Sequence, residues 1–513
     1  MDGSEERNWG PFGRPLFEDP AARSLSRVGV VDIGSNSVRL VVFDGAARSP
    51  AYFYNEKIMC GLGAGINQTG RLNPEGRVRA LKAIRRFQLL AAGMNLPPLT
   101  AVATAAVRDA EDGPEFREEL LRETGLQIHV IDGREEARLS AQGVLLGWPD
   151  ANGLMCDIGG SSMELAVIEN GQVGRRVSSG LGPLKLEGMK GGKKAMRQHI
   201  NDVLTELAKE IGTDHKRLFL VGGSWRAIAR LDMYRRDYPL TVLHEYRMAP
   251  KSLATTLKWI GKVDLDEVRS HTGTSSTRMA LVPTAAEVLK RLVTTFRPKE
   301  IAVSSYGIRE GLLYEQMPDR LRQRDPLIEA CRFSEQKDAR MPGFGKSLYA
   351  FIRPLVAHEP NARRRLVKAA CLLHDVTWRA HPDYRHEVCF DNVTRANLGG
   401  LNHQERVFLG LSLLHRYKNS REGCRFEETF TILTDQQIAR AETIGKAMRF
   451  GAMFAVNEPH KVATLALRPK RKELHLTIKP EAAGLFGEVA EARFQSLAAS
   501  LGTTPFVTIK DFG

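Results

Sequence analysis

The order of apolar and polar positions predicts a repeated α/β unit in the first part of the chain. An apolar run ends at Asp32, passes through a polar turn at 34–37 and continues as a second apolar run. This order predicts two strands joined by a tight turn. The stretch 154–168 has the same order, with Asp157 ending the first run and a Gly-Gly-Ser-Ser turn at 159–162. Two copies of one unit suggest two homologous half-domains that face each other across one site.

Further apolar runs alternate with segments of helical periodicity, which indicates an α/β sheet rather than a sandwich. One such helix should begin at Pro74, with Asn73 as its N-cap. Proline and charged residues at 318–326 interrupt the pattern, and the following sequence predicts mostly helices, then a hairpin with a basic turn. The expected divisions are a loose tail at 1–26, half-domains at 27–138 and 139–318, a helical domain at 319–455 and a small α/β domain at 456–513.

Composition narrows the class of protein. A chain of 513 residues with 42% apolar residues predicts two to four globular domains. No run of eighteen apolar residues occurs and the N-terminus is acidic and polar, so we expect neither a signal peptide nor a membrane anchor, and a cytoplasmic protein. The six cysteines lack metal-ligand spacing and are expected to be reduced structural thiols. A formal net charge of +14 favours a polyanionic partner without identifying it.

The two polar turns carry the candidate chemistry. Their backbone N–H groups and hydroxyls can donate hydrogen bonds to phosphate oxygens. The alternative is an ordinary hairpin with a polar turn, which has the same sequence pattern. Asp32 and Asp157 are candidate Mg²⁺ ligands, because small hard cations prefer carboxylate and water oxygens. A third Gly-Gly-Ser turn is a weaker signal. The candidate phosphate-binding residues are Gly34, Ser35, Asn36, Ser37, Gly159, Gly160, Ser161, Ser162, Gly222, Gly223 and Ser224.

Six segments together resemble the exopolyphosphatase and guanosine pentaphosphate phosphohydrolase (Ppx/GppA) family, within the acetate and sugar kinase, Hsp70 and actin superfamily. They are VDIGSNSVRLVVFD, ATAAVRDA, IDGREEARLSAQGV, CDIGGSSMEL, LVGGSWRAIA and SYGIREGLLYE, in the order and spacing of that family. The resemblance covers residues 28 to about 318 and is weaker beyond. It implies two actin-like (ribonuclease H-like) half-domains around a phosphate cleft, then an all-α HD-like domain and a small α/β appendix.

The resemblance also implies roles for single residues. Glu136 falls on the glutamate that activates water, Glu164 on a second catalytic glutamate and Arg108 on a phosphate-contacting arginine. Each has an ordinary alternative: an acidic residue in the first turn of a helix for Glu136, a solvent-facing strand position for Glu164 and a local ion pair for Arg108.

The helical region holds one metal-like pair, His374 and Asp375. Nearby His381, His386, His403, His415 and Asp391 have no spacing that matches a known HD site, so a structural pair is favoured over a second catalytic site. Three basic clusters are candidate walls of a polyanion channel, with solvated surface as the alternative. They are Arg363, Arg364 and Arg365; Lys470, Arg471 and Lys472; and Lys190, Lys193 and Lys194.

The leading hypothesis is a Mg²⁺-dependent exopolyphosphatase that releases terminal orthophosphate from inorganic polyphosphate and, by resemblance, forms a homodimer. The first alternative is hydrolysis of guanosine pentaphosphate. More distant alternatives are a superfamily kinase, a non-enzymatic actin-like or chaperone role, and nucleic-acid binding. A scaffold does not need Glu136 and Glu164, and the basic clusters contain few of the aromatic residues on which bases stack.

Overall fold

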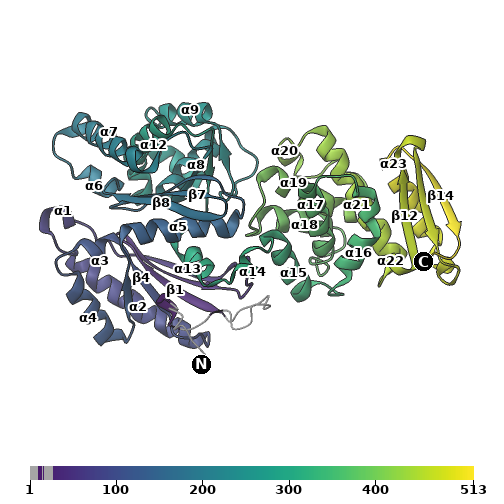
Figure 1. The fold of residues 1–513 in the computed structure, drawn as a ribbon, viewed down its shortest axis with the longest axis horizontal. Helices are drawn as coiled ribbons and strands as arrows, with labels where there is room; N and C mark the ends of the chain where they lie inside the picture. The colour runs from purple at the N-terminus through teal and green to yellow at the C-terminus, as the bar shows by residue number, and fades with distance from the viewer. Residues whose placement is uncertain (1–9, 14–15, 17–26, 513) are drawn as a thin grey trace, which may run out of the picture. The chain divides into compact units, whose positions relative to one another are not determined.

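The computed structural model describes residues 10–13, 16 and 27–512, and the chain divides between Arg324 and Asp325 into two compact units (Figure 1). Most of the predicted tail at 1–26 lies outside the described residues. A 3-10 turn, η1 (Gly10–Phe12), and the buried Leu16 belong to the first unit. The division into two units is a property of the structure, and the finer domain limits stay predictions.

The first sheet has the strand order β3-β2-β1-β4-β5. Its strands are β1 (Val28–Ile33), β2 (Ser37–Phe43), β3 (Tyr52–Met59), β4 (Thr100–Ala103) and β5 (Ile128–Val130). Its helices are α1 (Ile66–Thr69), α2 (Pro74–Gly93), α3 (Ala105–Asp109) and α4 (Gly113–Thr124). The predicted start of α2 is confirmed, since the Asn73 side chain accepts a hydrogen bond from the Gly76 N–H and Pro74 opens the helix.

The second sheet has the strand order β10-β11-β9-β6-β7-β8. Its strands are β6 (Gly153–Ile158), β7 (Met163–Glu169), β8 (Gln172–Ser179), β9 (Arg217–Gly222), β10 (Arg247–Met248) and β11 (Glu300–Val303). Its helices are α6 (Pro183–Glu187), α7 (Gly192–Ile211), α8 (Gly223–Arg235), α9 (Pro250–Ile260), α10 (Leu265–Thr272), α11 (Ser276–Ala280) and α12 (Val282–Phe296). The order β8-β7-β6-β9-β11 repeats the order of the first sheet, and the predicted pair of actin-like halves is confirmed.

Two helices, α5 (Gly133–Gly147) and α13 (Ile308–Gln316), lie between the two sheets (Figure 1). Their close approach depends on glycine: a Cβ on Gly311 would lie 1.8 Å from the Leu139 carbonyl oxygen. One core cluster contains side chains of both sheets together with those of α5 and α13, for example Val30 of β1 and Phe219 of β9. The expected half-domain limit at 138/139 falls inside α5. Side chains of α5 pack against both sheets, so this helix belongs to neither half alone. The first unit ends with α14 (Asp319–Arg322).

The second unit is helical and ends in a three-stranded sheet of order β12-β13-β14. Its elements are α15 (Pro326–Asp338), α16 (Phe344–Ile352), η2 (Arg353–Val356), α17 (Asn361–Leu373), α18 (Arg385–Arg395), α19 (His403–Tyr417), α20 (Glu427–Phe430), α21 (Asp435–Phe454), α22 (Pro459–Val462), β12 (Ala463–Arg468), η3 (Pro469–Arg471), β13 (Glu473–Ile478), η4 (Pro480–Leu485), α23 (Glu488–Ser500) and β14 (Thr504–Ile509). The predicted hairpin, helix and final strand are all present. Within the described part of the chain, every helix is too short or too polar to cross a bilayer.

Candidate active site

The two polar turns have the same local geometry. In the β1–β2 turn the Gly34 N–H donates to the Ser37 carbonyl at 3.0 Å, and in the β6–β7 turn the Gly159 N–H donates to the Ser162 carbonyl at 3.0 Å. Each bond closes a tight hairpin and leaves the N–H groups at the tip of the turn available. The tips face each other across the half-domains, since the Ser161 hydroxyl donates to the Ser35 hydroxyl at 3.2 Å.

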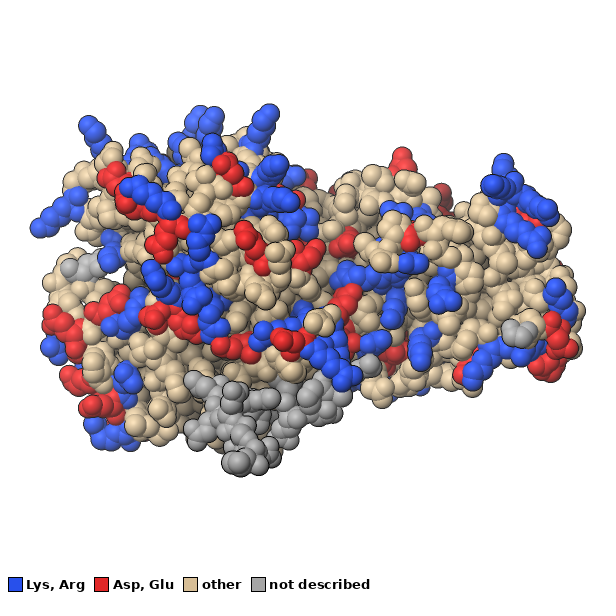
Figure 2. Space-filling model, in the orientation of Figure 1, with Lys and Arg blue, Asp and Glu red and all other residues tan. Residues whose placement is uncertain are grey.

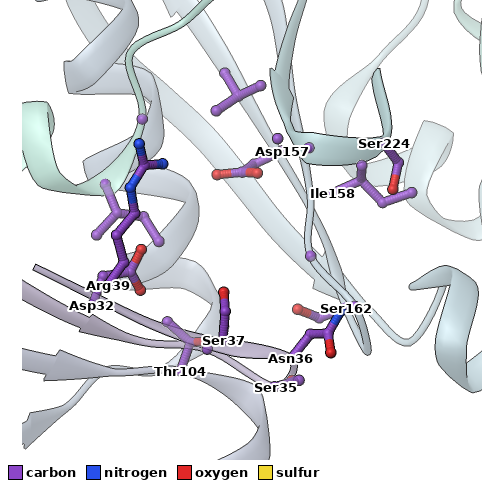
Figure 3. A pocket seen from close by; sticks show the side chains of 18 of the residues that line it. Asp32, Ser35, Asn36, Ser37, Arg39, Thr104, Asp157, Ile158, Ser162 and Ser224 are labelled. Atoms are coloured by element: carbon purple, nitrogen blue, oxygen red, sulfur yellow. The ribbon is translucent and has the colours of Figure 1, made fainter. Parts of the chain in front are cut away.

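A cavity of about 220 Å³ opens between the turns (Figure 3). Both turns line it, and so do Asp32 from β1, Asp157 from β6 and the Gly222–Ser224 turn at the start of α8. The structure therefore brings together the three turns and both aspartates that the sequence singled out. Ser161, Arg108 and Glu164 are not among the residues that line this cavity.

The carboxyl groups of Glu136, Asp157 and Glu164 lie close to one another, and those of Glu136 and Asp157 line the cavity. Glu136 lies in the first turn of α5, where the Asp132 side chain caps the helix, and is only 5% exposed. Glu164 lies directly opposite Asp157 in the antiparallel β6–β7 pair and is 0% exposed, so it is not a solvent-facing strand residue. The Oε2 atoms of Glu136 and Glu164 are buried and accept no hydrogen bond from any described residue. Such buried acceptors are costly unless a ligand, water or cation satisfies them.

Burial and mutual repulsion raise the pKa values of Glu136, Glu164 and Asp157. Burial, with the charges of Glu164 and Asp157, raises the pKa of Glu136 well above its usual range. Burial and the Asp157 charge raise the pKa of Glu164 to about 8. The pKa of Asp157 is also raised, chiefly by burial, although the Ser140 hydroxyl donates a hydrogen bond to its Oδ2. Once ionised, a carboxylate of raised pKa is a stronger proton acceptor than an exposed one.

Arg108 lies beside this carboxyl group. Its Nη1 is 3.6 Å from the Glu136 Oε2, and its Nε donates to Asp109 at 2.9 Å. The local ion pair considered from the sequence is present, and the same guanidinium also faces Glu136. Arg108 can therefore favour the ionised form of Glu136.

Five cations that the sequence reading missed line the cavity: Arg39, Lys57, Arg226, Arg278 and Arg309. We call them the basic wall. Burial and the neighbouring arginines, Arg278 first among them, lower the pKa of Lys57 to about 8. The Arg278 guanidinium covers Gly223, where a Cβ would lie 2.7 Å from its Nη2. Repulsion and burial on this scale favour an anionic ligand in the cavity.

A local signal existed for only part of the basic wall. Arg39 lies opposite Asp32 in the β1–β2 pair, and Lys57 lies opposite Arg39 in the β2–β3 pair. Hairpin register therefore places Arg39 near Asp32 and could have suggested Lys57. Arg226 lies in the first turn of α8, directly after the Gly-Gly-Ser turn. Arg278 in α11 lies outside every segment that resembles the family.

The donor set fits a small hard cation only in part. Asp32 and Asp157 both line the cavity and supply carboxylate oxygens, the ligand type that Mg²⁺ prefers. Among the described residues, however, no group of three or more His, Cys, Asp or Glu side chains is arranged to hold a metal ion. Mg²⁺ commonly keeps several waters and uses substrate phosphates as ligands, so two carboxylates suffice for such a site.

The candidates of the second unit have local partners. Asp375 accepts two hydrogen bonds from Arg340, both at 2.7 Å, and burial lowers the pKa of His374 to about 4. This supports the structural reading of the His374-Asp375 pair, because the carboxylate is already fully paired.

The two basic clusters of the second unit differ. In the 363–365 cluster, Arg363 pairs with Glu359, Arg364 with Asn361 and Arg365 with Asp325. The 470–472 cluster is exposed at the hairpin turn between β12 and β13, where Figure 2 shows Lys and Arg side chains gathered. A role of either cluster in a channel stays a prediction.

Comparison with known proteins agrees with this geometry. Residues 41–320 match the model of the Ppx/GppA phosphatase family, and residues 344–506 match the model described as exopolyphosphatase, C-terminal. Exopolyphosphatase 1 of Mycobacterium tuberculosis is 24% identical over 304 residues, which cover 57% of this chain and 88% of the relative. Retrograde regulation protein 2 of Saccharomyces cerevisiae is 24% identical over 468 residues, which cover 83% of this chain and 78% of the relative.

Solved structures support the fold. The crystal structure of an exopolyphosphatase from Cytophaga hutchinsonii superimposes with a TM-score of 0.52 at 24% identity, covering 57% of this chain and 98% of that one. An exopolyphosphatase-like protein superimposes with a TM-score of 0.50 at 22% identity, covering 57% and 98%. Because the family model alone spans more than half of the sequence, the chain belongs to the Ppx/GppA phosphatase family and is a phosphatase of the hydrolase class.

Proposed function

We propose that this enzyme is an exopolyphosphatase that hydrolyses the terminal phosphoanhydride bond of inorganic polyphosphate. The observation that carries the proposal is a single cavity lined by both acidic and basic side chains. Asp32, Asp157 and Glu136, whose buried Oε2 accepts no hydrogen bond from a described residue, line it together with the basic wall. Phosphoanhydride hydrolysis needs both: a base for water, and cations for the phosphoryl oxygens.

Glu136 is assigned as the residue that activates water. Its Oε2, which accepts no hydrogen bond from a described residue, can accept the proton of a water molecule, and its raised pKa makes the ionised group a stronger base than an exposed glutamate. The water oxygen attacks the terminal phosphorus, and the bond from that phosphorus to the bridging oxygen breaks. The bridging oxygen stays with the shortened chain as its new terminal oxygen, and the water proton is held on Glu136.

Glu164 and Arg108 are assigned as positioning residues for the Glu136 carboxyl group. Glu164 is fixed by the Ser178 hydroxyl, which donates to its Oε1 at 2.9 Å, and its charge keeps the pKa of Glu136 high. Arg108 counters that repulsion from the other side. The turns at 34–37 and 159–162 are assigned to the terminal phosphoryl oxygens, and the Gly222–Ser224 turn to more distal phosphates.

The basic wall favours a linear phosphate chain over guanosine pentaphosphate. Five cations from β2, β3, α8, α11 and α13 can neutralise several successive phosphates. Among the described residues that line the cavity, none is aromatic, so no ring is available there to stack on a guanine base. Guanosine pentaphosphate stays the alternative substrate.

Members of this family generally depend on a divalent cation. In this chain Asp32 and Asp157 would hold Mg²⁺, together with waters and substrate oxygens. Bound there, the cation would neutralise charge on the phosphoryl group.

The proposal is tested by measuring phosphate release from long polyphosphate, tripolyphosphate and guanosine pentaphosphate in parallel, with Mg²⁺ present. We expect long polyphosphate to give the highest kcat/KM. A higher kcat/KM for guanosine pentaphosphate would transfer the assignment to that alternative. Phosphate transfer to an acceptor hydroxyl in place of release would indicate a kinase.

A further inference from the structure

A second cavity, of about 150 Å³, lies beside the active-site cavity and is also lined by residues of the two polar turns. We call it the side cavity. Its lining residues come from the two turns, from the glycine-rich segment after β3 and from the region of α6. They are Ser35, Asn36, Gly61, Gly63, Ala64, Gly65, Ile66, Gln68, Ser161, Leu184, Lys185 and Gly188.

The two cavities share a thin wall. Ser35, Asn36 and Leu184 line both of them. Where the turns meet, the wall consists of the hydrogen bond between the Ser161 and Ser35 hydroxyls, with Leu184 packed over Gly160. Rotation of small side chains is far faster than catalytic turnover. Passage between the cavities requires the Ser35, Ser161 and Leu184 side chains to move, next to a backbone hydrogen bond from the Leu184 N–H to the Gly160 carbonyl at 2.9 Å.

The lining of the side cavity suits a small anion in transit. Lys185 and residues with hydroxyl and amide side chains line it, and none of its described lining residues is acidic. Its volume corresponds to several water molecules at about 30 Å³ each, which is room for one orthophosphate ion. A single lysine, exposed to solvent, can attract such an ion without holding it tightly.

Glycine keeps this space open on the side of the β3–α1 segment. Gly61 and Gly65 have positive φ values of 67° and 79°, which favour glycine, and the Gly63 N–H donates to the Ser35 carbonyl at 2.8 Å. A Cβ on Gly63 would lie 3.1 Å from the Ser35 Cβ. The segment therefore stays close to the wall without filling the cavity.

When the enzyme cleaves the end of a polymer, the released phosphate and the remaining chain occupy the same cavity, so the order in which they leave matters. The released orthophosphate occupies the place of the terminal phosphate, between the polar turns, while the basic wall still holds the rest of the chain in the same cavity. The product cannot leave past the chain unless the chain first dissociates. We propose that orthophosphate leaves through the side cavity, so that the chain can advance by one phosphate without release. This inference rests on the proposed exopolyphosphatase function.

The test separates formation of phosphate from its release. Ala64→Phe places a ring in the side cavity, and Lys185→Ala removes its cation. Matched controls are Ala64→Ser, a small change at the same position, and Lys251→Ala, which removes an exposed lysine that does not line the cavity. Phosphate formed is measured after acid quench, and free phosphate with a fluorescent phosphate-binding protein, on the same long polyphosphate.

In Ala64→Phe we expect first-turnover formation of phosphate within about twofold of wild type, and a steady-state rate at least about tenfold lower, because product release then limits turnover. Phosphate formed should exceed free phosphate by one equivalent per active site before the steady state. Lys185→Ala should show the same effect in weaker form, both controls should behave as wild type, and tripolyphosphate should be affected less because its short remainder dissociates.

Three results would overturn the exit path: an unchanged steady-state rate in Ala64→Phe with a wild-type melting temperature, equal losses in first turnover and steady state, or equal losses on short and long substrates. If Ala64→Phe does not fold, the comparison of Lys185→Ala with Lys251→Ala decides by the same criteria. If the wild-type enzyme releases no phosphate from polyphosphate, the proposed function itself is refuted. The wild-type measurement shows this before any variant is made.

Discussion

Replacement of Glu136 by glutamine removes the proposed base and little else. The amide has the shape of the carboxyl group and stays buried at the same position, so the fold and the phosphate turns should be preserved. Loss of a general base costs about 10² to 10⁴ in rate, or about 3 to 5 kcal/mol of transition-state stabilisation. Because the Glu136 Oε2 accepts no hydrogen bond from a described residue and is assigned to the attacking water, we expect the loss in kcat, with KM changed by less than about threefold.

The assay is steady-state phosphate release from long polyphosphate as a function of pH. The base must be ionised, and burial with neighbouring charges raises its pKa, so wild-type activity should fall with decreasing pH well before an exposed glutamate would titrate. In Glu136→Gln this acidic limb should disappear together with most of the rate. The matched control is Glu135→Gln, which changes the adjacent carboxylate that binds Arg138. More than about half of wild-type kcat in Glu136→Gln would refute the assignment.

Other predictions address the cation, the basic wall, the second unit and stability. Asp157→Asn should raise the Mg²⁺ concentration needed for half-maximal activity at least about tenfold, and an unchanged Mg²⁺ titration would remove Asp157 from the site. Arg278→Ala should raise KM for polyphosphate, and this loss should shrink at high salt, where wild-type affinity also falls. Neutralising either basic cluster of the second unit should reduce the preference for long over short chains at low salt; equal effects on both lengths would exclude a channel role. Because the pKa of His374 falls from about 6.5 in the unfolded chain to about 4 in the fold, up to about 3 kcal/mol of stability, complete above pH 6.5, should be lost between pH 6.5 and 4. Chemical denaturation of wild type and His374→Gln at pH 6.5 and pH 4 measures this loss. An equal change in the free energy of unfolding in both proteins would contradict the prediction.

The sequence predicted what depends on local pattern. Both polar hairpins, the start of the helix at Pro74 and the duplication of the halves follow from runs of apolar residues and from turn residues that act within a few positions. Register across a hairpin could also be anticipated, and it explains why Asp157 and Glu164 lie opposite each other.

The basic wall could not be predicted in the same way. Lys57 comes from β3, Arg226 from α8 and Arg278 from α11, and only the tertiary fold brings them to one cavity. The net charge of +14 indicated a polyanion but could not separate these cations from those paired on the surface, such as Arg365 with Asp325. The roles of Glu136 and Glu164 likewise came from resemblance, and burial is what distinguishes them physically from ordinary helix and strand positions.

The central claim is that water attacks the terminal phosphorus of polyphosphate. Hydrolysis of long polyphosphate in H₂¹⁸O, stopped at partial conversion, tests it most directly. The account predicts one ¹⁸O atom in each orthophosphate released and none in the remaining chains, which shorten only by loss of orthophosphate. Label in the remaining chains, or fragments longer than orthophosphate among the products, would contradict it.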